Sequence, residues 1–561
     1  MKTKSYTMKK IIKILSLCFG IFLFLGSCET LELDLADNPN ALSPSQADAT
    51  FFLNAIQVDF AYWVHYVGHR SGELTRINYL SGRTYRDVYD PSDSDHIWRT
   101  AYRTIFEDIR LMNLLAEESG LTFHRAMGKV FQAYILLTLV DTFGDIPYSE
   151  ALLGSEGNLN PVADSGASVY QAAIELLNSA ITDFNADGPV PDDYYYGGDA
   201  EKWIKAVNSI KKKAYLNTGD LNSYNAITNY ITEAADDFQF EWGNNPATPD
   251  TRHPLYGGGR GNSSNYNDDN TNYSSTGGGE YMSNWLMFKM LNGHVGNKDP
   301  RMVYYFYRQV NETPGFDTDA DEEVLECGLP GFFVPQHYRT DLYPFCAPTN
   351  SASADANGYW GRDHGNDNGT PPDGFLRTLR GVYPACGTFD DESFEGQVNG
   401  DGHGGVGITP IMLSSWMHFM NAEVAVNSGG DPFDETVTGL THSLQKTDDL
   451  GGPAIEEETV NNYVAAFTSE WNASSSPEAK LDLWATEFFI ALTGNGIDAY
   501  NSYRRNGYPR DIQPNIEPDP GAFPVSLFYP ANYTSNNSNA TQKTDLNVRV
   551  FWNSSGATNL K

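Results

Sequence analysis

Apolar residues spaced three and four positions apart recur through the first half of the chain, and this spacing constrains the fold more than any other feature. Between residues 102 and 116 they are Tyr102, Ile105, Ile109, Met112 and Ala116, which share one face of a helix. The same pattern returns at residues 123–142, 170–184 and 203–214. Helices with one apolar face must bury it against a neighbour. The spacing therefore predicts an all-α, tetratricopeptide-like scaffold of helical pairs.

Polar residues and helix breakers mark the ends of these helices. Gly144 and Pro147 are expected to end the helix that begins near residue 123. Ser168 and Gln171 form a candidate capping box for the next helix, and Asp199 is expected to cap the one after it.

The composition changes after residue 245. Residues 256–279, 349–374 and 396–407 are rich in Gly, Ser, Asn and Tyr, which is typical of long binding loops. Residues 281–290 and 410–426 are expected to be helical between them, and an amphipathic pattern returns near residue 456. We therefore predict one domain over residues 28–561, with a helical scaffold at about 50–245 and 455–510 and a loop-rich excursion at about 246–454.

The N-terminus has the features of a bacterial lipoprotein signal. Lysines precede an apolar run at residues 14–25 that is too short to span a bilayer, and the run ends in Leu25-Gly26-Ser27-Cys28. Residues 1–27 are thus a predicted signal peptide, with cleavage before Cys28 and lipid attachment to its thiol. The alternative is an uncleaved signal anchor.

The charge balance restricts the partners. The chain has 72 acidic and 37 basic residues, a formal net charge of −35, and the signal contributes only lysines to it. Nucleic acid and anionic lipid are therefore poor partners, and contact with a membrane is expected only through the lipid anchor.

Three cysteines remain after Cys28, so they cannot all be paired. In an exported protein they allow one disulfide, either Cys327 with Cys346 or Cys346 with Cys386, and we favour the first. No histidine lies at zinc-ligand spacing from them.

Several motifs occur in a specific order behind the signal. They are residues 141–148 (Asp-Thr-Phe-Gly-Asp-Ile-Pro-Tyr), 202–209, 298–301 (Lys-Asp-Pro-Arg), 358–365 (Gly-Tyr-Trp-Gly-Arg-Asp-His-Gly), 371–374, 499–509 and 547–552. Together they resemble the SusD/RagB family of nutrient-binding outer-membrane lipoproteins, in its SusD-like branch. The resemblance implies a lipoprotein on the cell exterior that binds a glycan or other oligomeric nutrient and delivers it to a SusC-like TonB-dependent barrel, without a cofactor.

Two of these motifs also have a structural explanation. Asp141 and Asp145 flank a helix end at which a carboxylate can accept backbone hydrogen bonds. In so acidic a chain, Arg504 and Arg505 are expected to form internal ion pairs rather than to bind a ligand.

Sugar binding requires flat aromatic faces flanked by polar side chains, and two stretches supply them. The candidates in the first are Asn78, Tyr79, Arg83, Tyr85, Tyr89 and Trp98, in a polar loop near where the resemblance places part of an aromatic binding arc. Those in the second are Tyr256, Tyr266, Tyr273 and Tyr281.

Metal binding and catalysis have weaker support. Asp317, Asp319 and Asp321 alternate as calcium ligands do, but the stretch lacks the glycine and the terminal glutamate of an EF-hand loop, so a solvated acidic turn is favoured over a structural calcium site. His65 and His69 are interpreted as helix-face residues. The sequence contains no hydrolase elbow, P-loop or HExxH motif.

We therefore expect a binding protein and not an enzyme. The alternatives are a surface glycoside hydrolase or lyase, which needs two suitably spaced carboxyl groups, and a structural or adhesive surface lipoprotein.

Overall fold

The structure is a computed structural model that describes residues 48–245, 247, 249–257, 281–311, 313, 334–348, 358–366, 377–395 and 402–561. Helices dominate these residues, which confirms the all-α prediction and the paired-helix scaffold. None of the described helices is both long and apolar enough to span a membrane.

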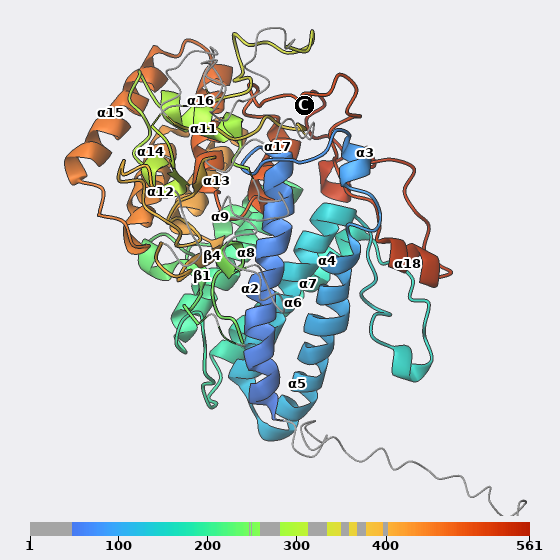
Figure 1. Ribbon diagram of the computed structural model, residues 1–561. Coiled ribbons are helices and arrows are strands. Elements are labelled where there is room, and N and C mark those ends of the chain that lie inside the picture. The colour runs from blue at the N-terminus through green and yellow to red at the C-terminus, as the bar shows by residue number, and fades with distance from the viewer. Residues whose placement is uncertain are drawn as a thin grey trace, which may run out of the picture.

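The N-terminal scaffold is a stack of long helices (Figure 1). Helix α2 packs on α5, α5 on α6, α6 on α7, and α7 on α8. Helix α6 is buried almost all round, as expected of the centre of such a stack. The bounds are α2 Ala49–Leu74, α3 Tyr85–Val88, α4 Asp95–Trp98, the π-helix η2 Arg99–Phe106, α5 Glu107–Ser119, α6 Thr122–Phe143, the 3₁₀ turn η3 Gly154–Glu156, α7 Gly166–Phe184, α8 Ala200–Thr218, α9 Leu221–Ala226 and the 3₁₀ turn η4 Ala234–Asp236.

The start of α7 differs from the prediction. Ser165, not Ser168, is the N-cap, and its side chain accepts a hydrogen bond from the backbone N of Ser168 at 3.2 Å. The predicted capping box is therefore wrong by one turn, because Ser165 has the extended backbone that an N-cap needs. The predicted cap of α8 is confirmed, since Asp199 accepts from the backbone N of Glu201 and Lys202.

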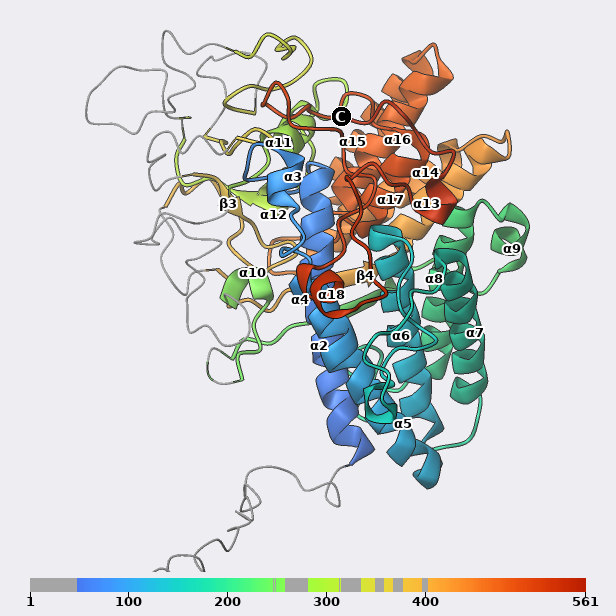
Figure 2. The same cartoon turned by 90° about the vertical axis from the view of Figure 1, so that its right-hand side faces the viewer.

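Helices α10, α11 and α12 and strand β3 of the excursion lie on the side of α2 that faces away from α7 and α8 (Figure 2), whereas its α13 and β4 contact α8. The excursion contains more regular structure near its end than the sequence indicated, since α14 was not predicted and the expected helix at 410–426 begins only after a strand. β1 pairs with β4 and β2 with β3, both antiparallel. The bounds are β1 Phe238–Glu241, α10 Pro254–Gly257, α11 Asn284–Asn292, α12 Met302–Tyr305, β2 Phe306–Tyr307, β3 Leu379–Arg380, β4 Ile408–Met412, α13 Ser414–Asn427, α14 Phe433–Gln445 and the 3₁₀ turn η7 Lys446–Asp449.

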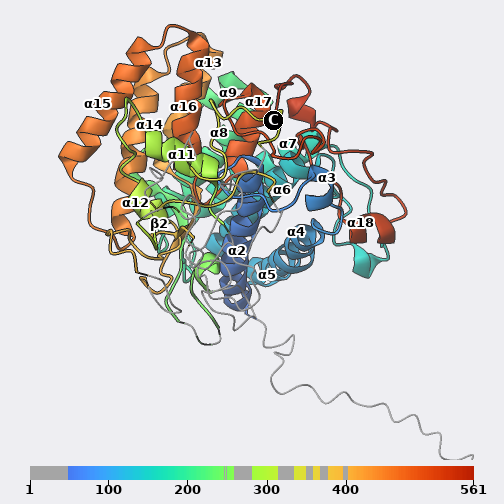
Figure 3. The same cartoon turned by 45° about the horizontal axis from the view of Figure 1, so that its top comes forward.

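Helices α15 and α16 form a second group with α13 and α14 (Figure 3), whereas α17 packs on α2, α18 on α4, and η8 on α7 and α8. The bounds of the C-terminal elements are α15 Glu457–Ala473, α16 Pro477–Ala491, α17 Ile497–Asn506, α18 Ala531–Asn536 and the 3₁₀ turn η8 Phe551–Asn553. One cluster of buried apolar side chains runs from Ala49 to Leu546 and includes residues of both the scaffold and the excursion. The extent of the domain and its inner boundaries stay predictions.

Candidate functional site

The structure brings one aromatic residue from each predicted stretch into a single cluster. The ring of Tyr79 lies edge-on to the ring of Tyr281, with 6.0 Å between centroids, and the ring of Trp360 is tilted against that of Tyr281, with 6.2 Å between centroids. Two guanidinium groups lie over the Tyr281 ring, that of Arg362 at 4.0 Å and that of Arg377 at 5.0 Å from its centroid. We call these five residues the Tyr281 cluster.

The backbone of the 358–365 motif holds this cluster together. Arg362 donates its N–H to the carbonyl of Met282 at 2.9 Å, and Asn284 returns a bond to the carbonyl of Arg362 at 3.0 Å. The two segments approach so closely that a Cβ at Gly361 would lie 2.0 Å from the Met282 oxygen, so only glycine fits there. The motif next contacts the first stretch, where Gly365 N donates to the carbonyl of Leu80 at 3.1 Å.

Asp363 holds the 358–365 motif in place through hydrogen bonds to three other segments of the chain. Its carboxylate accepts from Asn284 Nδ2 at 3.1 Å, Gln513 Nε2 at 2.9 Å and the backbone N of Cys346 at 2.7 Å. Burial raises the pKa of Asp363 to about 6, and the three hydrogen bonds oppose that rise. Because this carboxyl is buried and satisfied within the protein, its role is to position the loop.

The cluster combines apolar faces with cationic donors in a strongly acidic protein. Tyr281 and Arg362 are half-buried, whereas Tyr79, Trp360 and Arg377 are buried. The part of an aromatic ring that guanidinium groups leave uncovered can pack on the C–H face of a sugar, and the guanidinium N–H groups can donate hydrogen bonds to its hydroxyls. Such a site binds without a metal and without an unusual pKa.

The other residues of the first predicted stretch occupy different positions. Tyr85 and Tyr89 are each 1% exposed, so neither has a ring face open to solvent. Tyr89 Oη donates to Glu73 Oε2 at 3.2 Å, and Asn78 Nδ2 donates to the carbonyl of His69 at 3.0 Å. These contacts support the turn after α2. Arg83 is exposed and lies 3.7 Å from Glu517.

The remaining predicted aromatic residues are dispersed. Tyr256 is buried against Gly405, under the side chain of Arg252. Trp98 packs on Tyr102 and Tyr533 in a separate pocket. Tyr266 and Tyr273 lie outside the described residues, and the contact of every candidate with a ligand stays a prediction.

Sequence reasoning missed Trp360, Arg362 and Arg377 as site residues. A usable signal was present, because the 358–365 motif alternates glycine with aromatic and arginine residues, a pattern that suits a tight loop presenting flat and cationic groups. The motif was interpreted as a family signature only.

The predicted metal and disulfide sites are partly outside the described residues. Asp317, Asp319, Asp321 and Cys327 all lie there, as does the lipidation site Cys28. Within the described part, no group of three or more His, Cys, Asp or Glu side chains could hold a metal ion. Cys346 is disulfide-bonded and Cys386 is a free, buried thiol, which excludes the Cys346–Cys386 alternative here. Pairing of Cys346 with Cys327 stays a prediction.

The motifs interpreted as structural are indeed internal. The Asp141 carboxylate accepts from Asn501 Nδ2 at 2.8 Å and Trp552 Nε1 at 2.9 Å, and Arg504 donates to the Asp141 carbonyl at 2.8 Å. Arg505 forms a bidentate pair with Glu423. His65 and His69 both lie on α2, as predicted.

Comparisons with known proteins agree with this architecture. Residues 39–322 match a family described as "Starch-binding associating with outer membrane", and residues 435–551 match one described as "Susd and RagB outer membrane lipoprotein". No curated protein matches the chain by sequence.

Several solved structures share the fold. A SusD/RagB family protein from Bacteroides thetaiotaomicron is similar at 17% identity with a TM-score of 0.63, covering 91% of this chain and 100% of that one. A protein described as chitin-binding is similar at 19% identity and a TM-score of 0.61, covering 89% and 99%. A chitin-binding SusD homologue from Flavobacterium johnsoniae is similar at 16% identity and a TM-score of 0.54, covering 90% and 97%. At these identities the likeness shows a common fold.

Proposed function

The chain belongs to the SusD-like family of outer-membrane lipoproteins, and from this premise we propose that it binds a glycan at the Tyr281 cluster. The protein would be anchored through Cys28, face the cell exterior, and deliver its ligand to a SusC-like TonB-dependent barrel. Two solved structures of the same fold are described as chitin-binding, which supports a glycan over other oligomeric nutrients.

The single observation that carries this proposal is the meeting of Tyr79, Tyr281 and Arg362. These side chains come from three segments far apart in the sequence, and the half-buried ring of Tyr281 lies 4.0 Å from the Arg362 guanidinium. A sugar that packs on the part of the Tyr281 ring left uncovered by the guanidinium groups would lie next to hydrogen-bond donors. Its hydroxyls could then exchange water for guanidinium N–H groups without burying an unpaired charge.

A glycan array probed with the mature chain carrying Cys28→Ser, followed by calorimetric titration, tests the proposal. Tyr281→Ala should weaken binding about tenfold, because it removes the stacking face. Tyr194→Ala is the matched control, since Tyr194 is an exposed tyrosine of the helical scaffold. Equal affinity of the two variants would refute the assignment of the site.

Delivery requires a partner, and this part of the proposal has its own test. The wild-type lipoprotein, purified from outer membranes in mild detergent, should bring a TonB-dependent barrel with it. Recovery of the lipoprotein alone, at detergent concentrations that preserve other membrane complexes, would count against delivery while leaving glycan binding untouched.

The anchor and the orientation can be measured separately. Labelled palmitate should be incorporated into the wild-type protein and not into Cys28→Ser. Protease added to intact cells should degrade the wild-type protein if it faces outward. A protein that stays intact until the cells are lysed would contradict the exterior location.

We propose a non-catalytic role at this cluster. Asp363 is the carboxyl group of the 358–365 motif, and its hydrogen bonds to Asn284, Gln513 and Cys346 occupy it in support of the loop. The bound glycan should therefore keep its chain length after prolonged incubation with the purified protein. Shortened products would favour the hydrolase or lyase alternative.

A further inference from the structure

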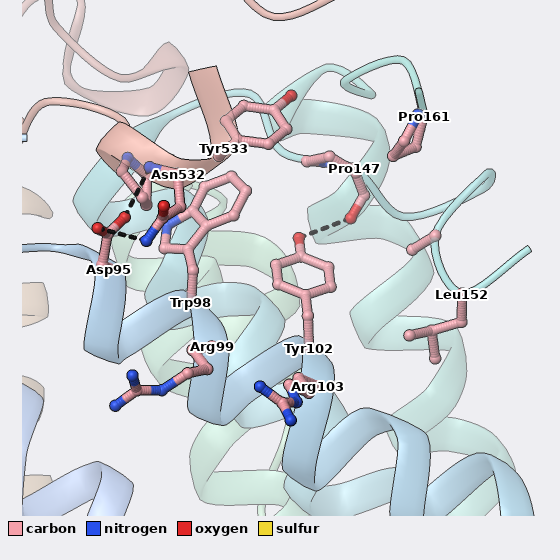
Figure 4. Close-up of a pocket in the computed structure, with 12 residues that line it drawn as sticks. Asp95, Trp98, Arg99, Tyr102, Arg103, Pro147, Leu152, Pro161, Asn532 and Tyr533 are labelled. Carbon is pink, nitrogen blue, oxygen red and sulfur yellow. Dashed lines mark hydrogen bonds between the residues drawn. The ribbon is translucent and has the colours of Figure 1, made fainter. Parts of the chain in front are cut away.

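A second pocket, separate from the Tyr281 cluster, opens between α4, η2, the 147–161 loop and α18 (Figure 4). Its volume is about 420 Å³, and almost all of its lining is apolar. Trp98 forms its floor with Tyr102 and Tyr533, whose ring centroids lie 5.2 Å and 4.6 Å from that of Trp98. Leu152 and Pro161 close the opposite side.

The pocket is built from the N-terminal scaffold and the C-terminal segment at residues 530–533, and not from the excursion. Every described residue that lines it belongs to 95–161 or 530–533. Asp95, Trp98, Arg99, Tyr102 and Arg103 follow one another at helical spacing on one face. That face lies on α4 and the π-helix η2, and π-helical turns are rare and often occur at functional sites.

Cationic groups border this apolar space. Arg103 is exposed and makes no hydrogen bond or ion pair with any described residue. Arg99 donates to His96 Nδ1 at 2.9 Å and has no carboxylate partner in the described part of the chain. The nearby carboxylate of Asp95 is already occupied, because Asn532 donates its backbone N–H to it at 2.9 Å and its Nδ2 at 2.7 Å. An uncompensated cation is unusual in a chain with 72 acidic and 37 basic residues.

The cationic rim favours a ligand that carries acceptor oxygens over a pure hydrocarbon, because guanidinium groups bind carboxylates through charge-assisted hydrogen bonds.

We call this second pocket the Trp98 pocket. From its geometry we propose that it binds a compact aromatic or alicyclic carboxylate. The ring would pack between Trp98, Tyr102 and Leu152, and the carboxylate would lie near Arg103. A free sugar fits less well, because its many hydroxyls would meet a lining with few hydrogen-bonding groups. The site is independent of glycan binding at the Tyr281 cluster.

The test is titration of the mature chain carrying Cys28→Ser with 2-naphthoate and with its neutral analogue 2-naphthamide, followed by calorimetry and ligand-observed NMR. Saturable binding of naphthoate, tighter than that of naphthamide, is expected. Ala151→Phe should abolish it by filling the pocket, since Ala151 is a half-buried lining residue. Tyr533→Ala is a second variant, to be used if Ala151→Phe fails to fold. It removes a half-buried ring of α18 from the pocket lining and should weaken naphthoate binding.

Arg103→Gln should weaken naphthoate binding about threefold, as expected for one solvent-exposed ion pair, and leave naphthamide binding unchanged. Arg110→Gln is the matched control, because Arg110 lies further along the same continuous helix and is paired with Glu107. Glycan binding should be unaffected in all of these variants, so the two proposals can fail separately.

Three results would overturn the inference. They are no saturable binding of naphthoate, binding that survives both Ala151→Phe and Tyr533→Ala, and equal affinity for naphthoate and naphthamide.

Discussion

Arg504 on α17 and Arg362 in the excursion make the same contact in two different settings. The Arg504 guanidinium lies 3.8 Å from the centroid of the Tyr500 ring, and that of Arg362 lies 4.0 Å from the centroid of Tyr281. Arg504 is fully buried, and it donates to the carbonyls of Asp141 and Val525 and to the side chain of Asn501. Arg362 is half-buried between loops.

The difference lies in what surrounds the contact. Around Arg504 the protein supplies hydrogen-bond partners from segments far apart in the chain, so the arginine acts as an internal cross-link. At the Tyr281 cluster, Tyr281 and Arg362 are both half-buried. The same pair of groups therefore stabilises the fold in one place and is suited to recognition in the other, and burial decides between the two.

The largest expected effect comes from breaking the internal contact. Arg504→Ala should lower the free energy of unfolding by ~4 kcal/mol, because it leaves the buried carbonyls of Asp141 and Val525 without their donor. Denaturant titration measures this. A loss below ~1 kcal/mol would mean that water replaces the guanidinium, and that the contrast with Arg362 does not hold.

His294 is a second buried cation, and its contribution to stability should depend on pH. Burial of His294 opposes its positive charge, but hydrogen bonds from its ring to Glu470 and Glu487 outweigh this and raise its pKa to about 9 from 6.5. The protonated form is therefore favoured on folding. Its contribution of ~3 kcal/mol should be complete below pH 6.5 and be lost as the pH rises to about 9.

The difference in unfolding free energy between the wild type and His294→Gln, measured at pH 6 and above pH 9, isolates this contribution. The difference should shrink as the pH rises. A difference that stays constant across the interval would show that the histidine is not charged in the folded protein.

A smaller effect is expected at the open contact. Arg362→Ala should weaken glycan binding several-fold and change the free energy of unfolding by less than ~1 kcal/mol, because Arg362 is half-buried. Arg339→Ala is the control, since Arg339 is an exposed arginine of the same excursion that pairs with Asp341. Calorimetry and denaturant titration on the same samples separate the two effects, and a large loss of stability without loss of affinity would reverse the assignment.

The smallest effect is expected at a surface ion pair near α17. Arg510 is about half-exposed and pairs with Asp482 at 2.6 Å. Arg510→Ala should cost only ~0.5 kcal/mol, because solvent screens the pair. A cost equal to that of Arg504→Ala would show that burial is not the property that distinguishes these arginines.

The helices follow from the sequence because their signal is local. An apolar residue every three or four positions specifies both a helix and the face that it buries, and this holds for α5, α6, α7 and α8 as predicted. The internal ion pair of Arg505 was also predictable, since a scarce cation in an acidic chain finds partners within it. Arg504 is internal as well, but the predicted ion pair is wrong for it, because its guanidinium donates to backbone carbonyls and to Asn501. Local signals failed where two caps compete, so α7 begins at Gly166 under Ser165.

The Tyr281 cluster could be predicted only in part from the sequence. Composition pointed to Tyr79 and Tyr281 among ten candidates, but it could not show that these two meet, that Tyr85 and Tyr89 are buried, or that Trp98 belongs to another pocket. Loop residues have no periodicity that assigns a side chain to the inside or the outside. Their placement depends on contacts across hundreds of residues, such as that of Gly365 with Leu80, and only the tertiary structure determines those contacts.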